Sequence, residues 1–295
     1  MPKASTYRRN EVTFEKLLKL AYKKTKDHQK EEEAVKLLLM ELSNQDPHLF
    51  FLNLKNEVDP IIEKDFLEKL DLYIHHHIPV QHLIGHSYFY GYKLIVNDHV
   101  LIPRGETEQL VEHVLFYYDK YFNNDQLDVL DLGTGSGCIG LTLSLEEKNL
   151  NVTISDISKD ALEVATKNRD NLSANAQIIL SDLFENIKSK FDIIVSNPPY
   201  IPDNELVDLI VEKEPSVALY GGTLGTDFYK KILDQSKSYI KEKALIAFEH
   251  GYQQKNEIYT YAKQAYPNGI IIQLKDLAGK DRFTFVGIGG VLSQE

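Results

Sequence analysis

The sequence contains four consecutive residues whose groups could hold a planar nitrogen for reaction: Asn197, Pro198, Pro199 and Tyr200. The side-chain oxygen of Asn197 and the main-chain carbonyl of Pro198 can accept the two N–H groups of an amide or aromatic amine. These bonds strengthen as the nitrogen gains positive charge, so they stabilise the transition state more than the ground state. The prolines hold the carbonyl rigidly, and Tyr200 offers an aromatic face to a flat group. A rigid turn after a strand is the purely structural interpretation.

A second group of candidate residues is the glycine-rich run Gly133, Thr134, Gly135, Ser136 and Gly137. Glycine is needed where a backbone turns sharply against a ligand, because a Cβ atom would collide. Dinucleotide-binding loops use G-x-G-x-x-G and aim a helix at a pyrophosphate. The spacing here is G-x-G-x-G, the form we associate with methyltransferases, whose cofactor carries no phosphate. Alone, the run is equally consistent with a tight strand–helix turn.

Acidic residues follow the next two expected strands. Asp156 ends the strand after the glycine run, where a carboxylate can accept hydrogen bonds from both ribose hydroxyls of a nucleoside. Asp182 ends the third strand, where it can accept from an adenine amino group while Leu183 covers the ring. Each has a structural alternative, since Asp156 or Ser158 could cap the following helix and Asp182 could be an exposed loop residue. The ordered set at successive strand ends is far more specific than any one member.

Alternating strands and helices must position these residues. Strands are expected at 128–132, 152–156, 177–180, 192–196, 245–249 and 270–274, with a last strand at 282–288. Helices are expected between several of them, notably at 159–167 and 227–240. This order predicts a mostly parallel, doubly wound α/β sheet covered on both faces. Ligands of such sheets bind at the carboxyl ends of the strands.

The chain before residue 107 has a different character. Apolar residues recur with helical spacing between residues 11 and 75, and Asp59-Pro60 is a helix start, which together predict a bundle of four or five helices. The aromatic and β-branched stretch that follows predicts a hairpin. We therefore expect a helical bundle over 1–75, a linker with a β-hairpin over 76–106, and a catalytic domain over 107–295.

The composition of the 295-residue chain bounds its class. A hydrophobic fraction of 43% is typical of a globular protein, and no apolar run approaches the roughly 20 residues that cross a bilayer. The first residues, around Arg8 and Arg9, lack the apolar stretch of a secretory signal. One cysteine, Cys138, permits no internal disulfide or cysteine-based zinc site. A cytoplasmic protein without membrane contact is expected, and a net charge of −11 argues against broad nucleic-acid binding.

The sequence around these residues resembles the glutamine-N5 methyltransferases that modify peptide chain release factors. The similarity extends from about residue 79 to residue 287. It includes the linker hairpin at 79–92, a signature at 101–108, a pattern at 214–222 and a closing hairpin at 276–282. Two positions depart from the family pattern: Gly105 stands where Pro is usual, and Leu224 where Asp is usual. Neither is expected to contact the reacting groups.

The resemblance implies a Rossmann-like class I methyltransferase domain with an antiparallel last strand, preceded by a small α-helical bundle. It implies S-adenosyl-L-methionine as cofactor and S-adenosyl-L-homocysteine as product. By position, the cofactor would be held by Gly133, Thr134, Gly135, Ser136, Gly137, Asp156, Asp182, Leu183 and Asn197. The substrate would be the glutamine of the Gly-Gly-Gln motif in class I release factors, which links the chain to translation termination. Asn197, Pro198, Pro199 and Tyr200 would bind it, with Asn197, Pro198 and Tyr200 catalytic.

Three other interpretations remain at this point. A nucleic-acid amine methyltransferase, acting on adenine N6 or guanine N2, would share the Asn197 segment but should carry a basic groove. A non-catalytic cofactor-binding protein would not need that segment. Metal binding is suggested by His75, His76, His77, His82 and His86, but consecutive histidines cannot converge on one ion, and a solvated helix end is preferred. We expect a monomer with no metal, and a helical bundle that docks the release factor.

Overall fold

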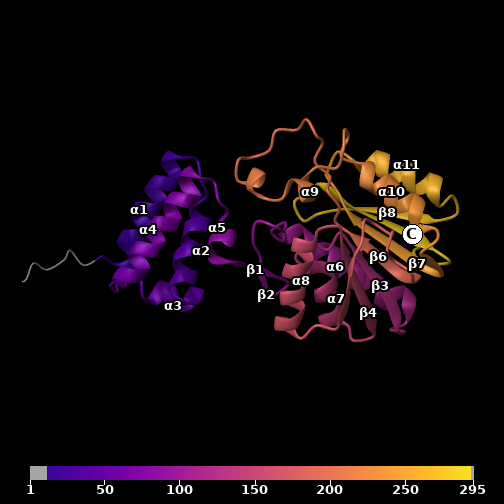
Figure 1. Cartoon of the computed structure of the whole chain (residues 1–295), viewed down its shortest axis with the longest axis horizontal. Helices are drawn as coiled ribbons and strands as arrows, with labels where there is room; N and C mark the ends of the chain where they lie inside the picture. The colour runs from indigo at the N-terminus through magenta and orange to yellow at the C-terminus, as the bar shows by residue number, and fades with distance from the viewer. Residues whose placement is uncertain (1–11, 294–295) are drawn as a thin grey trace, which may run out of the picture. The chain divides into compact units, whose positions relative to one another are not determined.

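The computed structural model describes residues 12–293, so Arg8, Arg9 and the first residues of the expected bundle lie outside the described residues. Contacts divide the chain into two units (Figure 1). The helical unit comprises the described residues up to Gly85 together with Leu209–Lys213. The sheet unit comprises His86–Asp208 and the residues from Glu214 onward. The dividing point after Gly85 assigns the expected hairpin to the sheet unit.

The helical unit contains five α-helices and a 3₁₀ turn (Val211–Lys213) in its described part. The α-helices are α1 (Phe14–Asp27), α2 (Glu32–Leu42), α3 (Pro47–Leu52), α4 (Pro60–His75) and α5 (Val80–Ile84). Their apolar faces meet in a core that includes Leu17, Leu38, Phe50 and Phe66. The side chain of Asp59 accepts a hydrogen bond from the Ile61 N–H at 2.7 Å, which confirms the predicted helix start.

The histidine run ends a helix, which is the solvated helix end expected from the sequence. His75 is the last residue of α4 and His76 its C-cap, and both are exposed. Lys30 Nζ lies 2.8 Å from His77 Nδ1. Within residues 12–293, no three His, Cys, Asp or Glu side chains are placed to share a metal ion. In the same range, no helix has the length and apolar character to cross a membrane.

The sheet unit begins with the predicted hairpin. Strands β1 (His86–Phe89) and β2 (Tyr92–Ile95) pair antiparallel, with Phe89 opposite Tyr92. The two residues between them, Tyr90 and Gly91, have φ angles of 53° and 80°. Two positive φ angles match the right-handed twist of the flanking strands, which is why glycine stands at the second position.

A seven-stranded sheet forms the centre of the sheet unit. Its strands are β3 (Leu127–Leu132), β4 (Leu150–Asp156), β5 (Ala176–Leu180), β6 (Phe191–Ser196), β7 (Ile240–Glu249), β8 (Ile270–Lys275) and β9 (Asp281–Ile288). Their spatial order is β5-β4-β3-β6-β7-β9-β8, and β9 alone runs in the direction opposite to the other six strands. The predicted fold class, a Rossmann-like doubly wound sheet with an antiparallel last strand after a helical region, is confirmed.

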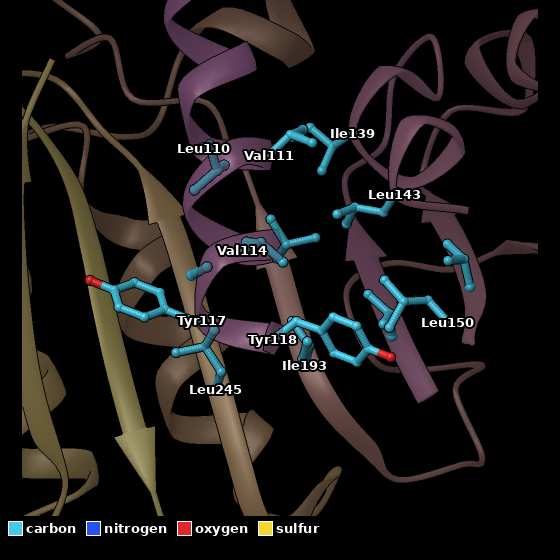
Figure 2. Packing of buried hydrophobic residues seen from close by; sticks show 14 of the residues in the cluster. Leu110, Val111, Val114, Tyr117, Tyr118, Ile139, Leu143, Leu150, Ile193 and Leu245 are labelled. Carbon is cyan, nitrogen blue, oxygen red and sulfur yellow. The ribbon is translucent and has the colours of Figure 1, made fainter. Parts of the chain in front are cut away.

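Helices cover both faces of this sheet (Figure 1). On one face lie α6 (Gly105–Phe122), α7 (Cys138–Glu146) and α8 (Lys159–Leu172), and on the other α10 (Asp227–Ser236) and α11 (Lys255–Ala265). Two short elements, a 3₁₀ turn (Val211–Lys213) and α9 (Ser216–Leu219), precede α10. Figure 2 shows α6 placing Val111 and Val114 toward Ile139 and Leu143 of α7. This apolar layer fixes the N-terminal end of α6 relative to the strands.

Three predicted elements were wrong at one end: the helix expected over 159–167 continues to Leu172, the strand expected over 245–249 begins at Ile240, and a third ends early. The helix expected over 227–240 ends at Ser236, and Ile240 instead begins β7. Tyr239 and Ile240 continue the apolar rhythm of the helix, so periodicity alone extends it. In the folded chain Tyr239 stacks on Phe184, with ring centroids 4.7 Å apart, and Ile240 pairs with Phe191 of β6. Packing against the sheet therefore overrides the local pattern.

Gly105, one of the two departures from the family pattern, occupies the first position of α6. A Cβ atom there would meet no atom within 4 Å, and Arg104 before it is extended (φ −103°, ψ 150°), as a residue before proline must be. We expect Gly105→Pro to raise stability by about 0.4–1 kcal/mol, because proline restricts the unfolded chain and fits the first helical turn. Thermal melts of wild type, Gly105→Ala and Gly105→Pro test this, and a lower melting temperature for proline than for alanine contradicts it.

Candidate functional site

Parallel strands bring the predicted site residues to one edge of the sheet. The carboxyl ends of β3, β4, β5 and β6 lead into the glycine run, Asp156, Asp182 and Asn197. A single cavity at this edge is lined by Gly133, Thr134, Gly135, Ser136, Asp156, Asp182, Leu183, Asn197, Pro198 and Pro199. The structure thus brings together ten of the twelve predicted site residues. Gly137 and Tyr200 are the other two, and they lie beside the cavity.

The glycine run turns from β3 into α7 with left-handed backbone angles. The φ angles of Gly133 and Gly135 are 74° and 56°, and both residues face open space where a side chain would be. Gly137 (φ 87°) instead packs against α7, because a Cβ atom there would lie 2.7 Å from Leu141 Cδ1. The first two glycines therefore keep the cavity open, and the third sets the approach of the helix.

Asp131, the last but one residue of β3, holds this turn in shape. Its side chain is fully buried, and Oδ2 accepts hydrogen bonds from Thr134 Oγ1 and from the Gly140 N–H at 2.8 Å. Its Oδ1 is buried without a partner. Burial raises the pKa of Asp131 to about 6, against the opposing effect of those hydrogen bonds. No sequence motif indicates this role of the Asp131 carboxylate.

Asp156 lies between the glycine turn and α8. Its Oδ2 accepts from the Gly135 N–H at 2.8 Å and its Oδ1 from the Ser158 N–H at 2.9 Å. Ser158 itself caps α8, since its hydroxyl accepts from the Ala161 N–H at 3.1 Å. Burial raises the pKa of Asp156 from its ordinary value. The helix cap is thus supplied by serine, and the Asp156 carboxylate is held at the cavity by main-chain donors.

Asp182 and Leu183 follow β5 in a strained turn. Leu183 has a φ angle of 45°, which is uncommon for a residue with a side chain. The Ser181 hydroxyl stabilises the turn by donating to the Leu183 carbonyl at 2.8 Å and accepting from the Asn186 N–H at 3.0 Å. Both Asp182, which is exposed, and Leu183 line the cavity. The turn therefore presents one carboxylate and one apolar side chain to a ligand.

The Asn197 segment follows β6, in the middle of the sheet. Asn197 Nδ2 donates to Thr107 Oγ1 at 3.3 Å, whereas Asn197 Oδ1 is buried without a hydrogen-bond partner. A buried acceptor left unpaired costs free energy unless a ligand supplies a donor. Asn197, Pro198 and Pro199 all line the cavity. The side-chain oxygen predicted to accept a substrate N–H is therefore the one that the protein leaves unsatisfied.

Tyr200, unlike the three residues before it, does not line the cavity. Its ring packs at the edge of the core between the sheet and α10, and burial raises the pKa of its hydroxyl to about 12. The ring of Phe228, in α10, does line the cavity, and no sequence motif indicates this. The main-chain carbonyl of Tyr200 accepts a hydrogen bond from Gln254 Nε2 at 2.6 Å. Tyr200 thus anchors the segment from outside the cavity.

The segment that resembles the family signature closes the cavity from the α6 side. Leu101, Pro103, Arg104 and Thr107 all line it. Buried Glu214 accepts from the Ile102 N–H at 2.9 Å and forms an ion pair with Arg104. This carboxylate joins two stretches that are far apart in sequence and fixes the cavity wall.

Comparisons with known proteins agree with this geometry. Residues 115–232 match the family model described as "Methyltransferase small domain". The chain is 37% identical to a release factor glutamine methyltransferase of Bacillus anthracis, over 92% of this chain and 98% of the relative. It is 41% identical to the protein of the same name from Bacillus subtilis, over 86% and 90%. A methyltransferase structure from Pyrococcus furiosus has the same fold, with a TM-score of 0.51 at 16% identity, over 68% of this chain and 91% of that one.

The doubly wound sheet, the glycine turn at its first strand and the matched family define an S-adenosylmethionine-dependent class I methyltransferase. Within that class, the chain belongs to the release factor glutamine methyltransferase family. The cavity fits the cofactor, since open space beside Gly133 and Gly135, the Asp156 carboxylate and the apolar Leu183 suit an adenosyl group.

A close backbone approach behind the Asn197 segment gives a testable consequence. A Cβ atom on Gly221 would lie 2.2 Å from the Pro199 carbonyl oxygen. We expect Gly221→Ala to displace this segment and lower kcat by up to about 10²-fold, while cofactor affinity changes little. Gly105→Ala is the matched control, because its Cβ atom meets nothing within 4 Å. Steady-state methylation kinetics with both variants test this, and equal kcat values contradict the expectation.

Proposed function

We infer that the chain transfers a methyl group from S-adenosyl-L-methionine to the side-chain amide nitrogen N5 of a glutamine. The substrate is the glutamine of the Gly-Gly-Gln motif in class I peptide chain release factors, so the reaction acts on translation termination. The observation that carries this function is Asn197 Oδ1, a buried acceptor without a partner at the cavity wall. The choice of a release factor as substrate is supported by the relatives named release factor glutamine methyltransferase, which match most of the chain.

The residues of the chain account for the reaction. S-adenosylmethionine, when bound, supplies an electrophilic methyl group on a sulfonium. An amide nitrogen is a poor nucleophile because its lone pair is delocalised, and its N–H groups gain positive charge as it attacks. Asn197 Oδ1 and the Pro198 carbonyl accept these N–H groups and stabilise the developing charge. No strong base is needed, because the surplus proton can leave to water after transfer.

We propose that the cofactor is held by the residues at the strand ends. Asp156 would accept hydrogen bonds from the ribose hydroxyls, and Asp182 with Leu183 would hold the adenine. The main chain from Gly133 to Gly137, with Thr134 and Ser136, would surround the methionine part beside Asn197. Their shared position around one cavity supports this assignment for all but Gly137, which would act through the start of α7.

The identity of the substrate can be tested by comparing methylation of a release factor with methylation of nucleic acid. Labelled S-adenosylmethionine, the enzyme and either a purified release factor or duplex DNA and ribosomal RNA would be incubated. Label is expected in the release factor and not in a variant whose Gly-Gly-Gln glutamine is replaced by alanine. Label in nucleic acid alone would instead support a nucleobase amine as acceptor.

We propose further that the helical unit docks the release factor. Its helix α3 exposes three apolar side chains: Leu49 (47% exposed), Phe51 (58%) and Leu52 (68%). Exposed apolar clusters of this kind mark protein-binding surfaces. The combined change Phe51→Ser and Leu52→Ser is expected to raise KM for the release factor about 10-fold with kcat unchanged. Ile61→Ser on α4, 78% exposed, is the control, and an unchanged KM in the α3 variant would remove α3 from the docking surface.

A cytoplasmic monomer without sequence-specific nucleic-acid contact completes the proposal. A net charge of −11 opposes binding to a phosphate backbone. Sedimentation of the enzyme alone and with a release factor tests the oligomeric state, and a stable dimer of the free enzyme would contradict this part.

A further inference from the structure

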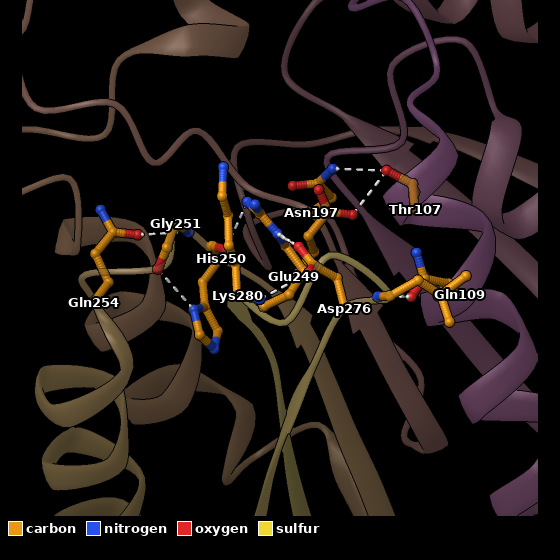
Figure 3. A network of polar contacts seen from close by, with 11 residues as sticks. Thr107, Gln109, Asn197, Glu249, His250, Gly251, Gln254, Asp276 and Lys280 are labelled. Carbon is orange, nitrogen blue, oxygen red and sulfur yellow. Dashed lines mark hydrogen bonds and ion pairs between the residues drawn. The ribbon is translucent and has the colours of Figure 1, made fainter.

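Three polar side chains from separate elements, two buried and the third, Asn197, partly buried, form a chain of hydrogen bonds that ends at the proposed acceptor (Figure 3). Thr107 lies in the first turn of α6, Asn197 follows β6, and Glu249 ends β7. Thr107 Oγ1 donates to Glu249 Oε2 at 2.7 Å and accepts from Asn197 Nδ2 at 3.3 Å. Thr107 is 2% exposed and Glu249 1%. Of these side chains, Asn197 and Thr107 line the cavity.

The direction of these hydrogen bonds follows from the chemistry of the groups. A carboxylate can only accept hydrogen bonds, so the single proton of the Thr107 hydroxyl must point to Glu249. The hydroxyl then has only lone pairs to offer Asn197, which must meet it with its NH₂ group. Asn197 Oδ1 is thereby turned away from Thr107, and it is this atom that is buried without a partner.

We propose that Thr107 and Glu249 are positioning residues that fix the orientation of the Asn197 amide, so that its oxygen and not its NH₂ group meets the substrate. The proposal rests on the proposed function, in which Asn197 Oδ1 accepts an N–H of the glutamine amide. If the Asn197 amide were rotated by about 180°, its NH₂ group would face the NH₂ group of the substrate glutamine, and the two groups would repel each other. Because an Asn side chain has nearly the same shape in both orientations, only its hydrogen-bond partners can select one.

The surroundings of Glu249 hold its carboxylate in place and set its charge. The Tyr229 hydroxyl donates to the Glu249 main-chain carbonyl at 2.9 Å. Burial raises the pKa of Glu249 to about 7, while the Thr107 hydrogen bond and the nearby Arg282 guanidinium act in the opposite direction. The titratable and charged groups that interact with it are Arg282, Glu106, Tyr200, Tyr229 and Cys138.

Protonation of Glu249 would remove this selection. A neutral carboxyl group can donate to Thr107, and the threonine proton is then free to turn toward Asn197 and favour the rotated amide. Activity should therefore be highest when Glu249 is charged and should fall on the acidic side of neutrality. This dependence separates orientation by hydrogen bonds from simple packing, which would not respond to one proton.

Three variants of the full-length enzyme test the proposal with a release factor as substrate. Thr107→Val has the same shape without a hydroxyl, Thr107→Ser keeps the hydroxyl, and Glu249→Gln replaces the carboxylate by an amide that can donate or accept. For each variant, kcat and KM are measured between about pH 6 and 9, a range that extends about one unit or more to each side of the Glu249 pKa. Cofactor affinity is measured by calorimetry. Thr153→Val, a buried threonine of β4 outside the cavity lining, is the matched control.

We expect Thr107→Val to lower kcat about 10- to 100-fold with cofactor affinity unchanged, and Thr107→Ser to restore it to within about threefold. Glu249→Gln should lower kcat and flatten the acidic limb seen in wild type. Wild-type kcat in Thr107→Val, failure of Thr107→Ser to rescue, or an unaltered acidic limb in Glu249→Gln would each overturn the proposal. Failure of the wild-type enzyme to methylate the release factor would instead reject the proposed function.

Loss of folding can be separated from loss of orientation. The pKa of Glu249 is raised from its ordinary value of 4.5 to about 7 in the folded protein. Between these two pH values the folded protein holds a proton that the unfolded chain has released. The carboxylate therefore reduces stability as pH rises through this window, and a neutral glutamine removes that effect. Glu249→Gln should melt no lower than wild type at neutral pH, which leaves its lower kcat as an effect on the site.

Discussion

Replacing Asn197 with alanine lowers kcat for release-factor methylation by about 10²- to 10³-fold, the usual consequence of removing one preorganised group that stabilises charge in a transition state. The substitution removes the buried Oδ1 acceptor and the Nδ2 donor to Thr107. Cofactor affinity should remain within a few-fold, because the ribose and adenine positions lie at other strand ends. Single-turnover methylation and calorimetry with S-adenosylmethionine measure the two effects separately.

The control for this experiment is Asn151→Ala. Asn151 is an exposed asparagine near the start of β4, at the opposite end of that strand from Asp156. Its loss should leave kcat unchanged. A near-normal kcat in Asn197→Ala would contradict the proposed role of Asn197 as the acceptor of the substrate N–H.

Replacing Asp156 with alanine weakens S-adenosylmethionine binding by about 10- to 100-fold, since hydrogen bonds to a charged group contribute roughly 1.5–3 kcal/mol. The same carboxylate accepts from the Gly135 and Ser158 main-chain N–H groups, so the glycine turn also loses support. At saturating cofactor, kcat should fall much less than affinity. Calorimetry gives the affinity, and thermal melts show whether the turn alone is affected.

Asp156→Asn and Asp160→Ala complete this test. Asparagine keeps one acceptor oxygen and should give an intermediate affinity. Asp160 lies in the first turn of α8 and is exposed, so its loss should leave affinity unchanged. Equal affinities for wild type and Asp156→Ala would reject Asp156 as a cofactor ligand.

The parts of the site that could be predicted from the sequence are those fixed by local chemistry. Glycines at positive φ angles, a carboxylate at a strand end and an Asn-Pro-Pro-Tyr turn each carry their geometry within a few residues. The parallel sheet then brings them to one edge, and this too follows from the alternation of strands and helices. The fold class and the succession of strands and helices along the chain were accordingly predictable.

The remaining parts depend on contacts between distant segments. Thr107 and Glu249 are 142 positions apart, and nothing local to either indicates that they share a hydrogen bond. Tyr200 packs against the core and Phe228 lines the cavity, because the packing of α10 on the sheet decides which ring faces inward. The end of α10 was misjudged for the same reason, since Ile240 pairs with Phe191 across the sheet.

Mass spectrometry of a purified class I release factor, after incubation with the enzyme and S-adenosylmethionine, tests the central claim most directly. The predicted result is the addition of one methyl group, located by fragmentation to the glutamine of the Gly-Gly-Gln motif, and its absence with the Asn197→Ala enzyme. An unmodified glutamine after incubation with a folded, cofactor-binding enzyme, or a methyl group on another residue, would contradict it.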